Sequence, residues 1–279
     1  MKTGIKNILQ SLRIYHPLQT AFRKFIFAFK RAQYRMLFSV YKGSGFECNV
    51  CGSFYSKFVD DFPSKENRNA IEINKVIAGY GENILCPHCL SNARERLVIA
   101  MLCARFDISK KRILHLSPEK YIFDILKDKA IVTTADLHPG FYKSTDKNIK
   151  EENATALSFE NESFDLVIAN HIMEHIPDDE KAMKEIYRVL KLGGNLIMQV
   201  PYSETISTTI EELSINNPEK QSALFGQKDH VRIYSLQNYI KRLQLAGFIV
   251  DLIPYNSLKE YYKYAIQKEE SFLMIRKPN

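Results

Sequence analysis

The chain has 279 residues, enough for one large domain and a small one, and a hydrophobic content of 45% that suits a packed core and excludes global disorder. The formal net charge is +7, but residues 1–43 hold nine Lys and Arg and no acid, so the other 236 residues, with 30 basic and 32 acidic side chains, sum to −2. This distribution argues against a globular part that binds nucleic acid through general positive charge.

Residues 1–43 are predicted to be a basic arm containing an amphipathic helix. Residues 21–40 place their apolar side chains on one stripe at helical spacing, with most basic ones elsewhere. The stripe holds Phe22, Phe25, Ile26, Phe29, Met36, Leu37 and Val40. Such a helix suits an anionic membrane surface, packing on the protein's own body, or an RNA or protein partner. Without a long apolar span or a secretory signal, we expect a cytoplasmic protein, with peripheral contact at the inner membrane surface as one alternative.

Residues 44–104 are predicted to be a small zinc-ribbon domain. Four of the five cysteines form two C-x-x-C pairs separated by 34 residues, and these are Cys48, Cys51, Cys86 and Cys89. Four thiolates in this pattern predict a closed, structural zinc site with no vacancy for water; four reduced cysteines without metal are the alternative. Residues 60–70 are expected to be an inserted loop, and Cys103 a core thiol on an apolar helix.

Residues 105–279 alternate strand-like and helix-like segments. The strands are expected at 112–116, 130–136, 164–170, 195–201, 249–255 and 271–277, and helices at 118–128, 178–191 and 235–248. Ser117 and Ser235 are expected as N-cap residues, Pro118 as the first helical residue, and Gly193 and Gly194 as a helix stop. The alternation predicts an α/β fold with a doubly wound, mostly parallel sheet, in which ligands bind at the carboxyl ends of the strands.

A segment within this part carries a family resemblance. Residues 153–202 read "NATALSFENESFDLVIANHIMEHIPDDEKAMKEIYRVLKLGGNLIMQVPY". This closely resembles class I S-adenosylmethionine-dependent methyltransferases of type 11, although Asn153 replaces an acid and Leu192 a proline. The resemblance extends over residues 112–279. "LHLSPE" at 114–119 resembles a subgroup with an "LHxxPE" turn in place of a glycine-rich one, often with cysteine pairs upstream.

The resemblance implies an S-adenosylmethionine site built from strand ends. His115, Leu116, Ser117, Pro118 and Glu119 would surround the first turn, and Asp136 and Leu137 would meet the ribose. Asn153 and Ala154 would meet the adenine, and Asn170 and His171 would line the methyl side. The alternatives are a capped helix without a ligand at the first turn and an ordinary turn aspartate at Asp136. His175 is expected to be a packing residue more than a direct ligand.

Residues 225–235, "FGQKDHVRIYS", resemble a family turn over the acceptor pocket. Asp229, His230 and Arg232 could bind the acceptor there, and His230 or His171 could act as the base if the acceptor is a hydroxyl; a plain polar loop is the alternative. The function predicted is methyl transfer to a small-molecule or glycan-like acceptor. An RNA base methyltransferase and a non-catalytic binding module are the other two readings.

Overall fold

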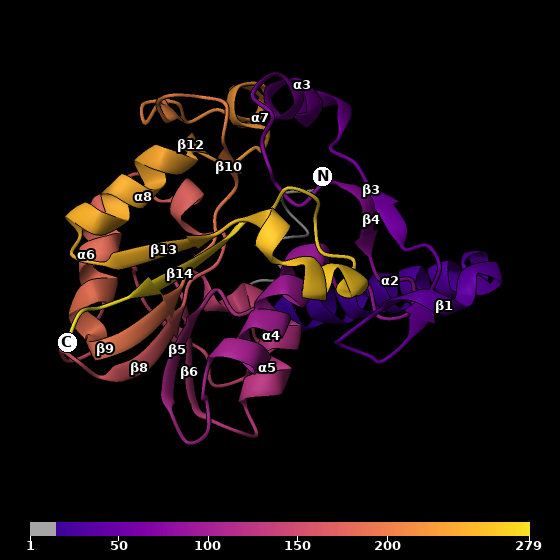
Figure 1. Ribbon diagram of the computed structural model, residues 1–279, viewed down its shortest axis with the longest axis horizontal. Helices are drawn as coiled ribbons and strands as arrows, with labels where there is room; N and C mark the ends of the chain where they lie inside the picture. Colours follow the sequence, from indigo (N-terminus) through magenta and orange to yellow (C-terminus); the bar gives the residue numbers. More distant parts are fainter. Residues whose placement is uncertain (1–14) are drawn as a thin grey trace.

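A seven-stranded sheet forms the centre of this computed structural model, which describes residues 15–279 (Figure 1). From edge to edge its strands are β7 (Lys150–Glu151), β6 (Ile131–Asp136), β5 (Arg112–Leu116), β8 (Phe164–Ile168), β9 (Leu190–Ile197), β14 (Phe272–Arg276) and β13 (Ile249–Ile253). The strands β5 to β9 pair in parallel, whereas β14 is antiparallel to both of its neighbours. The predicted doubly wound, mostly parallel sheet is confirmed.

The strand order creates a crevice at one edge of this sheet. From β5 the chain proceeds outward to β6 and β7, and then returns to place β8 on the other side of β5. Successive connections therefore leave β5 and β8 in opposite directions, which opens a space at their carboxyl ends. The register places Leu116 beside Ala135 and His115 beside Ile168, so the ends of β5, β6 and β8 meet at this crevice.

Helices cover both faces of the sheet (Figure 1). The helices α6 (Asp179–Val189) and α8 (Leu236–Leu245) lie on one face, and α4 (Ala93–Arg105) and α5 (Lys120–Leu126) lie on the other. Side chains in β5 alternate between the two cores. Leu114 and Leu116 pack with α6 and α8, whereas Ile113 packs with α4 and α5. A strand apolar on both faces is what a sheet covered on both sides requires.

Two predicted helix ends were wrong. Ser117 is not an N-cap residue and Pro118 is not helical, because α5 begins at Lys120 with Glu119 as its N-cap. The helix expected to stop at Gly193 and Gly194 ends at Val189 instead, and both glycines lie within β9. The pairing of β8 with β9 shifts register here, and Gly193 has a φ of 67° that lets the backbone bulge.

The other end predictions were closer. Ser235 occupies the N-cap position of α8 as predicted, although its side chain makes no capping hydrogen bond.

The prediction that Cys103 is a core thiol was wrong, because its side chain is exposed. Residues 97–102 of α4 fill the core, and the last turn of the helix then emerges from it.

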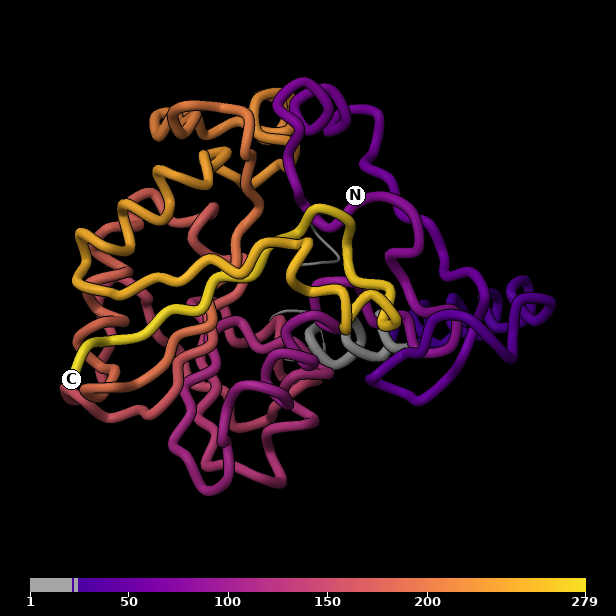
Figure 2. Tube along the Cα trace, viewed as in Figure 1, coloured from indigo at the N-terminus to yellow at the C-terminus, as the bar shows by residue number. Residues whose placement is uncertain are grey.

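The N-terminal part lies beside the sheet (Figure 2). It contains α2 (Tyr15–Leu37), η1 (Ser39–Tyr41), β1 (Lys42–Glu47), β2 (Phe54–Tyr55), β3 (Val59–Asp61), α3 (Lys65–Ile73) and β4 (Gly81–Leu85). The expected inserted loop is thus largely α3, a helix. The predicted helix of the arm is present as α2, and residues 1–14 of the arm lie outside the described residues. None of the helices in residues 15–279 is long and apolar enough to cross a membrane.

A small layer extends from the sheet toward α3. It comprises β10 (Tyr202–Ser203), β11 (Ile210–Glu211), α7 (Pro218–Phe225) and β12 (Arg232–Ser235). α7 packs against α3, where Ala70, Phe225 and Ile233 form a minor core. This contact places the N-terminal part over the carboxyl edge of the main sheet, where the site lies.

Candidate functional site

A cavity of about 610 Å³ opens at the crevice between β5, β6 and β8. Its volume lies within the range of roughly 300–1,000 Å³ typical of ligand pockets. Seven of the predicted cofactor residues line it, namely Leu116, Ser117, Asp136, Leu137, Asn153, Ala154 and His171. Phe141, Ile172 and Ile176 add apolar surface to this wall. The cavity therefore combines a carboxylate with an apolar wall, as a nucleoside ligand requires.

A hydrogen bond joins Ser117, which follows β5, to Asp136 at the end of β6. The Ser117 hydroxyl donates to Asp136 Oδ2 at 2.5 Å, and the His138 amide donates to Oδ1 at 2.6 Å. Ser117 reaches this position with a φ of 47°, in the left-handed region that glycine adopts most readily. The serine therefore takes the backbone conformation of a glycine while its side chain orients the carboxylate.

Four of the predicted cofactor residues do not line the cavity: His115, Pro118, Glu119 and Asn170. His115 is fully buried, and its Nε2 lies 2.7 Å from Glu119 Oε2. Burial alone would raise the pKa of Glu119, but the hydrogen bond and charge of His115, a backbone hydrogen bond and the charge of His171 together lower it. Glu119 is thus an anion held beneath the turn by a histidine.

Two asparagines predicted at the strand ends differ in position. Asn153 lines the cavity, and its side-chain oxygen accepts from the Thr155 amide and hydroxyl, both at 2.9 Å. Asn170 is buried and its oxygen accepts from the Gln199 amide at 3.1 Å. Asn170 therefore links β8 to the end of β9 and supports the adjacent His171.

A second cavity of about 330 Å³ adjoins the first. One wall comes from the N-terminal part and includes Asp61, Tyr80 and Arg94. The opposite wall comes from η3 (Met173–His175) and from the segment before β12. Both cavities are lined by three shared residues, His171, His175 and Gln227. These three side chains therefore mark the boundary between the two spaces.

His171 occupies this boundary in a strained conformation. Its φ is 53°, and neither ring nitrogen has a hydrogen-bond partner among the described residues. Left-handed backbone at a residue other than glycine costs about 1–3 kcal/mol and is concentrated at functional sites. Burial lowers the pKa of His171, so the ring is neutral at pH 7 and has a free lone pair.

The predicted acceptor residues have separate places. His230 is 7% exposed and lines the smaller cavity, and burial lowers its pKa to about 4. Asp229 is exposed and lines the larger cavity. Arg232 reaches the smaller cavity, but its guanidinium donates to Glu211 and to the carbonyls of Met173, Ile176 and Pro177. Its charge therefore holds η3 in place.

Comparison with known proteins agrees with this geometry. The family model of the methyltransferase domain matches residues 119–198, the stretch that contributes most of the strand ends around the larger cavity. Residues 119–198 thus match the methyltransferase domain family. The motifs predicted the same class, the S-adenosylmethionine-dependent methyltransferases, together with the doubly wound, mostly parallel sheet that the structure has.

Individual relatives of this methyltransferase domain align over short regions. The ubiquinone/menaquinone biosynthesis C-methyltransferase UbiE of Pasteurella multocida is 30% identical over 116 residues, which are 36% of this chain and 42% of UbiE. Rat arsenite methyltransferase is 43% identical over 42 residues, or 15% of this chain and 11% of that protein. A methyltransferase structure from Methanosarcina mazei is 16% identical with a TM-score of 0.47, covering 64% of this chain and 97% of that one. The chain thus spans less than half the length of these curated relatives.

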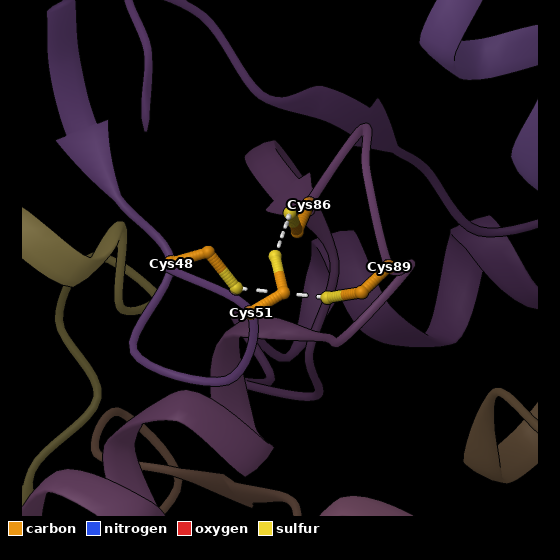
Figure 3. Close-up of side chains that lie close together, drawn as sticks. All are labelled: Cys48, Cys51, Cys86 and Cys89. Atoms are coloured by element: carbon orange, nitrogen blue, oxygen red, sulfur yellow. Dashed lines mark hydrogen bonds between the residues drawn. The ribbon is translucent and has the colours of Figure 1, made fainter. Parts of the chain in front are cut away.

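Four cysteines converge in the N-terminal part, beside the methyltransferase domain (Figure 3). The Sγ atoms of Cys48 and Cys89 are 3.6 Å apart, and those of Cys51 and Cys86 are 3.8 Å apart. Thiolates bound tetrahedrally to zinc at about 2.3 Å lie about 3.8 Å from one another. The four sulfur atoms are therefore spaced as a tetrahedral metal site requires.

Arg96 joins this cysteine cluster to the end of the chain. Its fully buried guanidinium donates to the carbonyls of Ser91, Asn83 and Ile84. It also donates to the carbonyls of Tyr264 and Ala265. Both residues lie in the link between β13 and β14, which contains η4 (Tyr255–Ser257) and η5 (Lys259–Tyr264). Arg96 therefore holds three segments of the chain together.

Several residues of the site were missed by sequence reasoning. Asp61, Tyr80 and Arg94 lie far from the family motif, and the N-terminal part and the start of α4 bring them to the smaller cavity. Glu174 and His175 lie within the quoted motif as "EH", and His175 was expected to be a packing residue. In the structure His175 lines both cavities, so the motif itself contained the signal.

Proposed function

We propose that the chain transfers a methyl group from S-adenosylmethionine in the larger cavity to an acceptor in the smaller one. The observation that carries this proposal is the shared boundary of the two cavities at His171, His175 and Gln227. A donor and an acceptor held on opposite sides of this boundary can meet in line, and such positioning supplies much of the rate enhancement of a group transfer.

The residues of the larger cavity fit the donor. The Asp136 carboxylate, oriented by Ser117, can accept from two ribose hydroxyls, and the apolar wall at Leu137 and Ala154 can hold an adenine. The cofactor, when bound, supplies an electrophilic methyl group on a sulfonium. Because Ser117 already has left-handed backbone, the "LHxxPE" turn can replace a glycine-rich turn, which supports placing the chain in that subgroup.

The smaller cavity suits a small-molecule acceptor or one sugar of a glycan-like acceptor. Its volume of about 330 Å³ accommodates a single ring with substituents. A hydroxyl acceptor would need a base, and the neutral rings of His171 and His230 face this space. RNA is the second candidate acceptor, but Asp61 and Glu174 line the cavity and the chain outside residues 1–43 has a net charge of −2.

We further propose that the four cysteines hold a structural zinc ion. Three of them are buried and the spacing of the sulfur atoms fits four thiolate ligands, which leaves no position for a substrate or water. The metal would fix the segment around Arg96, and would act on methyl transfer only through the position of that segment.

For α2 we propose peripheral contact with an anionic membrane surface. Phe22, Phe25 and Phe29 are 63%, 69% and 64% exposed, so this stripe does not pack on the described part of the chain. The opposite side of the helix is held by Arg31 and Arg35, which both donate to the His88 carbonyl. This orientation leaves the aromatic stripe available to lipid.

Calorimetry with S-adenosylmethionine and S-adenosylhomocysteine tests the central proposal. The wild-type chain should bind both ligands, and Asp136→Ala should weaken binding tenfold or more, since a hydrogen bond to a charged group contributes about 1.5–3 kcal/mol. Asp251→Ala, in the exposed edge strand β13, is the matched control and should bind like the wild type. Absence of binding at millimolar ligand would leave the non-catalytic binding module as the better reading.

A further inference from the structure

Three side chains of the smaller cavity lie close enough together to hold one metal ion. Glu174, His175 and His230 place one ligand atom each within 4.8 Å of one another. Two come from η3 and the third comes from the segment that precedes β12. His175 and His230 also meet edge to face, with ring centroids 4.7 Å apart. The cluster is separate from the four cysteines and lies in the smaller cavity.

Within residues 15–279, Glu174 has no Lys or Arg partner and no hydrogen-bond donor to its Oε2 atom. Its residue is 1% exposed, and Oε2 has no hydrogen-bond partner among the described residues. The nearest ionisable partner is His171, whose Nδ1 lies 3.7 Å from Oε1, too far for a hydrogen bond. A buried carboxylate normally pairs with a charge or coordinates a metal, because its burial alone costs several kcal/mol.

Two arginines lie near the cluster, and neither pairs with Glu174. Arg94 lines the smaller cavity but forms no ion pair with a described residue. Arg232 is the buried guanidinium closest in the chain to the cluster, but its donors bind Glu211 and three backbone carbonyls. No ion pair joins Glu174 to a Lys or Arg in residues 15–279. An external cation would complete the site.

The groups behind the cluster orient it as the second shell of a metal site does. His175 Nδ1 lies 3.2 Å from the Asp229 carbonyl and 3.7 Å from its carboxylate, so Nδ1–H donates and Nε2 keeps its lone pair. The Val231 amide donates to the Glu174 carbonyl at 2.9 Å, which fixes η3 beside the loop that carries His230.

We propose that Glu174, His175 and His230 bind a divalent cation whose open coordination positions face the smaller cavity. Two histidines and one carboxylate form a set that first-row metals accept while keeping positions open. The proposal deepens the proposed function and rests on it for the acceptor, which would be a hydroxyl compound that binds the cation through its oxygen. A cation there would hold this oxygen at the boundary and stabilise its anion.

The methyl group would pass from the sulfonium sulfur to the oxygen of the acceptor. The hydroxyl proton passes to a free ring nitrogen of His171, and the oxygen lone pair forms a bond to the methyl carbon. The carbon–sulfur bond of the sulfonium breaks, and its electron pair stays on sulfur as a thioether. The cation remains bound throughout and changes no oxidation state.

Mn²⁺ is the probe of choice, because its hard character and low place in the affinity order disfavour the four thiolates. The full-length protein, carrying one zinc ion per chain and no excess zinc, is titrated with Mn²⁺, and the free Mn²⁺ is followed by its electron paramagnetic resonance signal. We expect one Mn²⁺ per chain, and a loss of affinity of at least tenfold in His230→Ala and in His175→Ala. Glu180→Ala is the matched control, because Glu180 is exposed on α6 and lines neither cavity.

Calorimetry with S-adenosylhomocysteine in metal-free buffer is run on each protein. Its binding by both variants shows that they are folded, and if His230→Ala fails to bind, the half-buried His175 provides the second variant. The proposal is overturned if the wild type binds no Mn²⁺, or if both variants bind it like the control. Mn²⁺ binding without any S-adenosylhomocysteine binding would keep the cation site and refute the methyltransferase function instead.

Discussion

Replacing Arg96 by methionine removes the link between the cysteine cluster and the end of the chain at nearly constant side-chain volume. The guanidinium donates to five carbonyl oxygens at 2.5–3.2 Å and lies 4.8 Å from the ring centre of Phe58. In Arg96→Met these carbonyls stay buried without a donor. Removing one partner from a buried charged network costs about 3–5 kcal/mol, so we expect a loss of about 4 kcal/mol in the free energy of unfolding.

Urea unfolding of the zinc-loaded protein, followed by circular dichroism, measures this loss. Arg94→Met is the matched control, since Arg94 lies two residues away on the same helix and makes no hydrogen bond or ion pair with any described residue. Its effect should stay below about 1 kcal/mol, as for substitutions away from such networks. Equal losses in the two variants would refute the reasoning, because the hydrogen bonds of Arg96 would then contribute nothing measurable.

Three further predictions follow from separate parts of the molecule. Cys86→Ser should release zinc and raise the acceptor KM more than it weakens S-adenosylhomocysteine binding, as metal analysis, kinetics and calorimetry would show. Replacing Phe25 and Phe29 together by Asp should abolish flotation with anionic liposomes, while higher salt should only reduce it in the wild type, since salt does not screen apolar burial. Burial raises the pKa of Glu270 from 4.5 to about 7. The folded protein therefore loses stability as the pH rises from the pKa of this carboxyl in the unfolded chain to its pKa in the folded one. Thermal melts should show the advantage of Glu270→Gln over the wild type growing by about 3 kcal/mol between pH 5 and pH 8.

The sheet could be predicted from sequence because its signals are local. Each inner strand is a short apolar run, and the strands at 112–116 and 249–253 begin where the pattern placed them. The helix ends were less predictable. Serine is a common N-cap residue, but the hydroxyl of Ser117 donates to Asp136, nineteen residues later in the chain, and does not cap the helix. A local pattern cannot report a partner in another strand.

The site divides in the same way. Asp136 and His171 were predicted because each follows a strand whose end could be recognised. The proposed role of Glu174 in binding a cation depends on His230, which the loop before β12 places beside it. The two residues are more than fifty positions apart in the sequence. Arg94 was not predicted as a site residue, because no local pattern shows that the start of α4 faces η3 across a cavity. The sequence thus defines the cofactor cavity better than the acceptor cavity.

The two cavities depend on different parts of the chain, and this separates binding of the donor from choice of the acceptor. The larger cavity is lined by residues between 116 and 176 and by Gln227 and Asp229, and most of them lie in the stretch 119–198 that matches the methyltransferase domain family. The smaller cavity is lined in part by Asn92 and Arg94, which belong to the segment directly after Cys89. Asn92 starts α4 through a reciprocal pair of hydrogen bonds with Glu95, so the end of the cysteine cluster fixes the first turn of that helix and the direction in which Arg94 projects. A metal that orders the cysteines would therefore shape the acceptor wall without touching either substrate, which gives a structural ion a part in specificity.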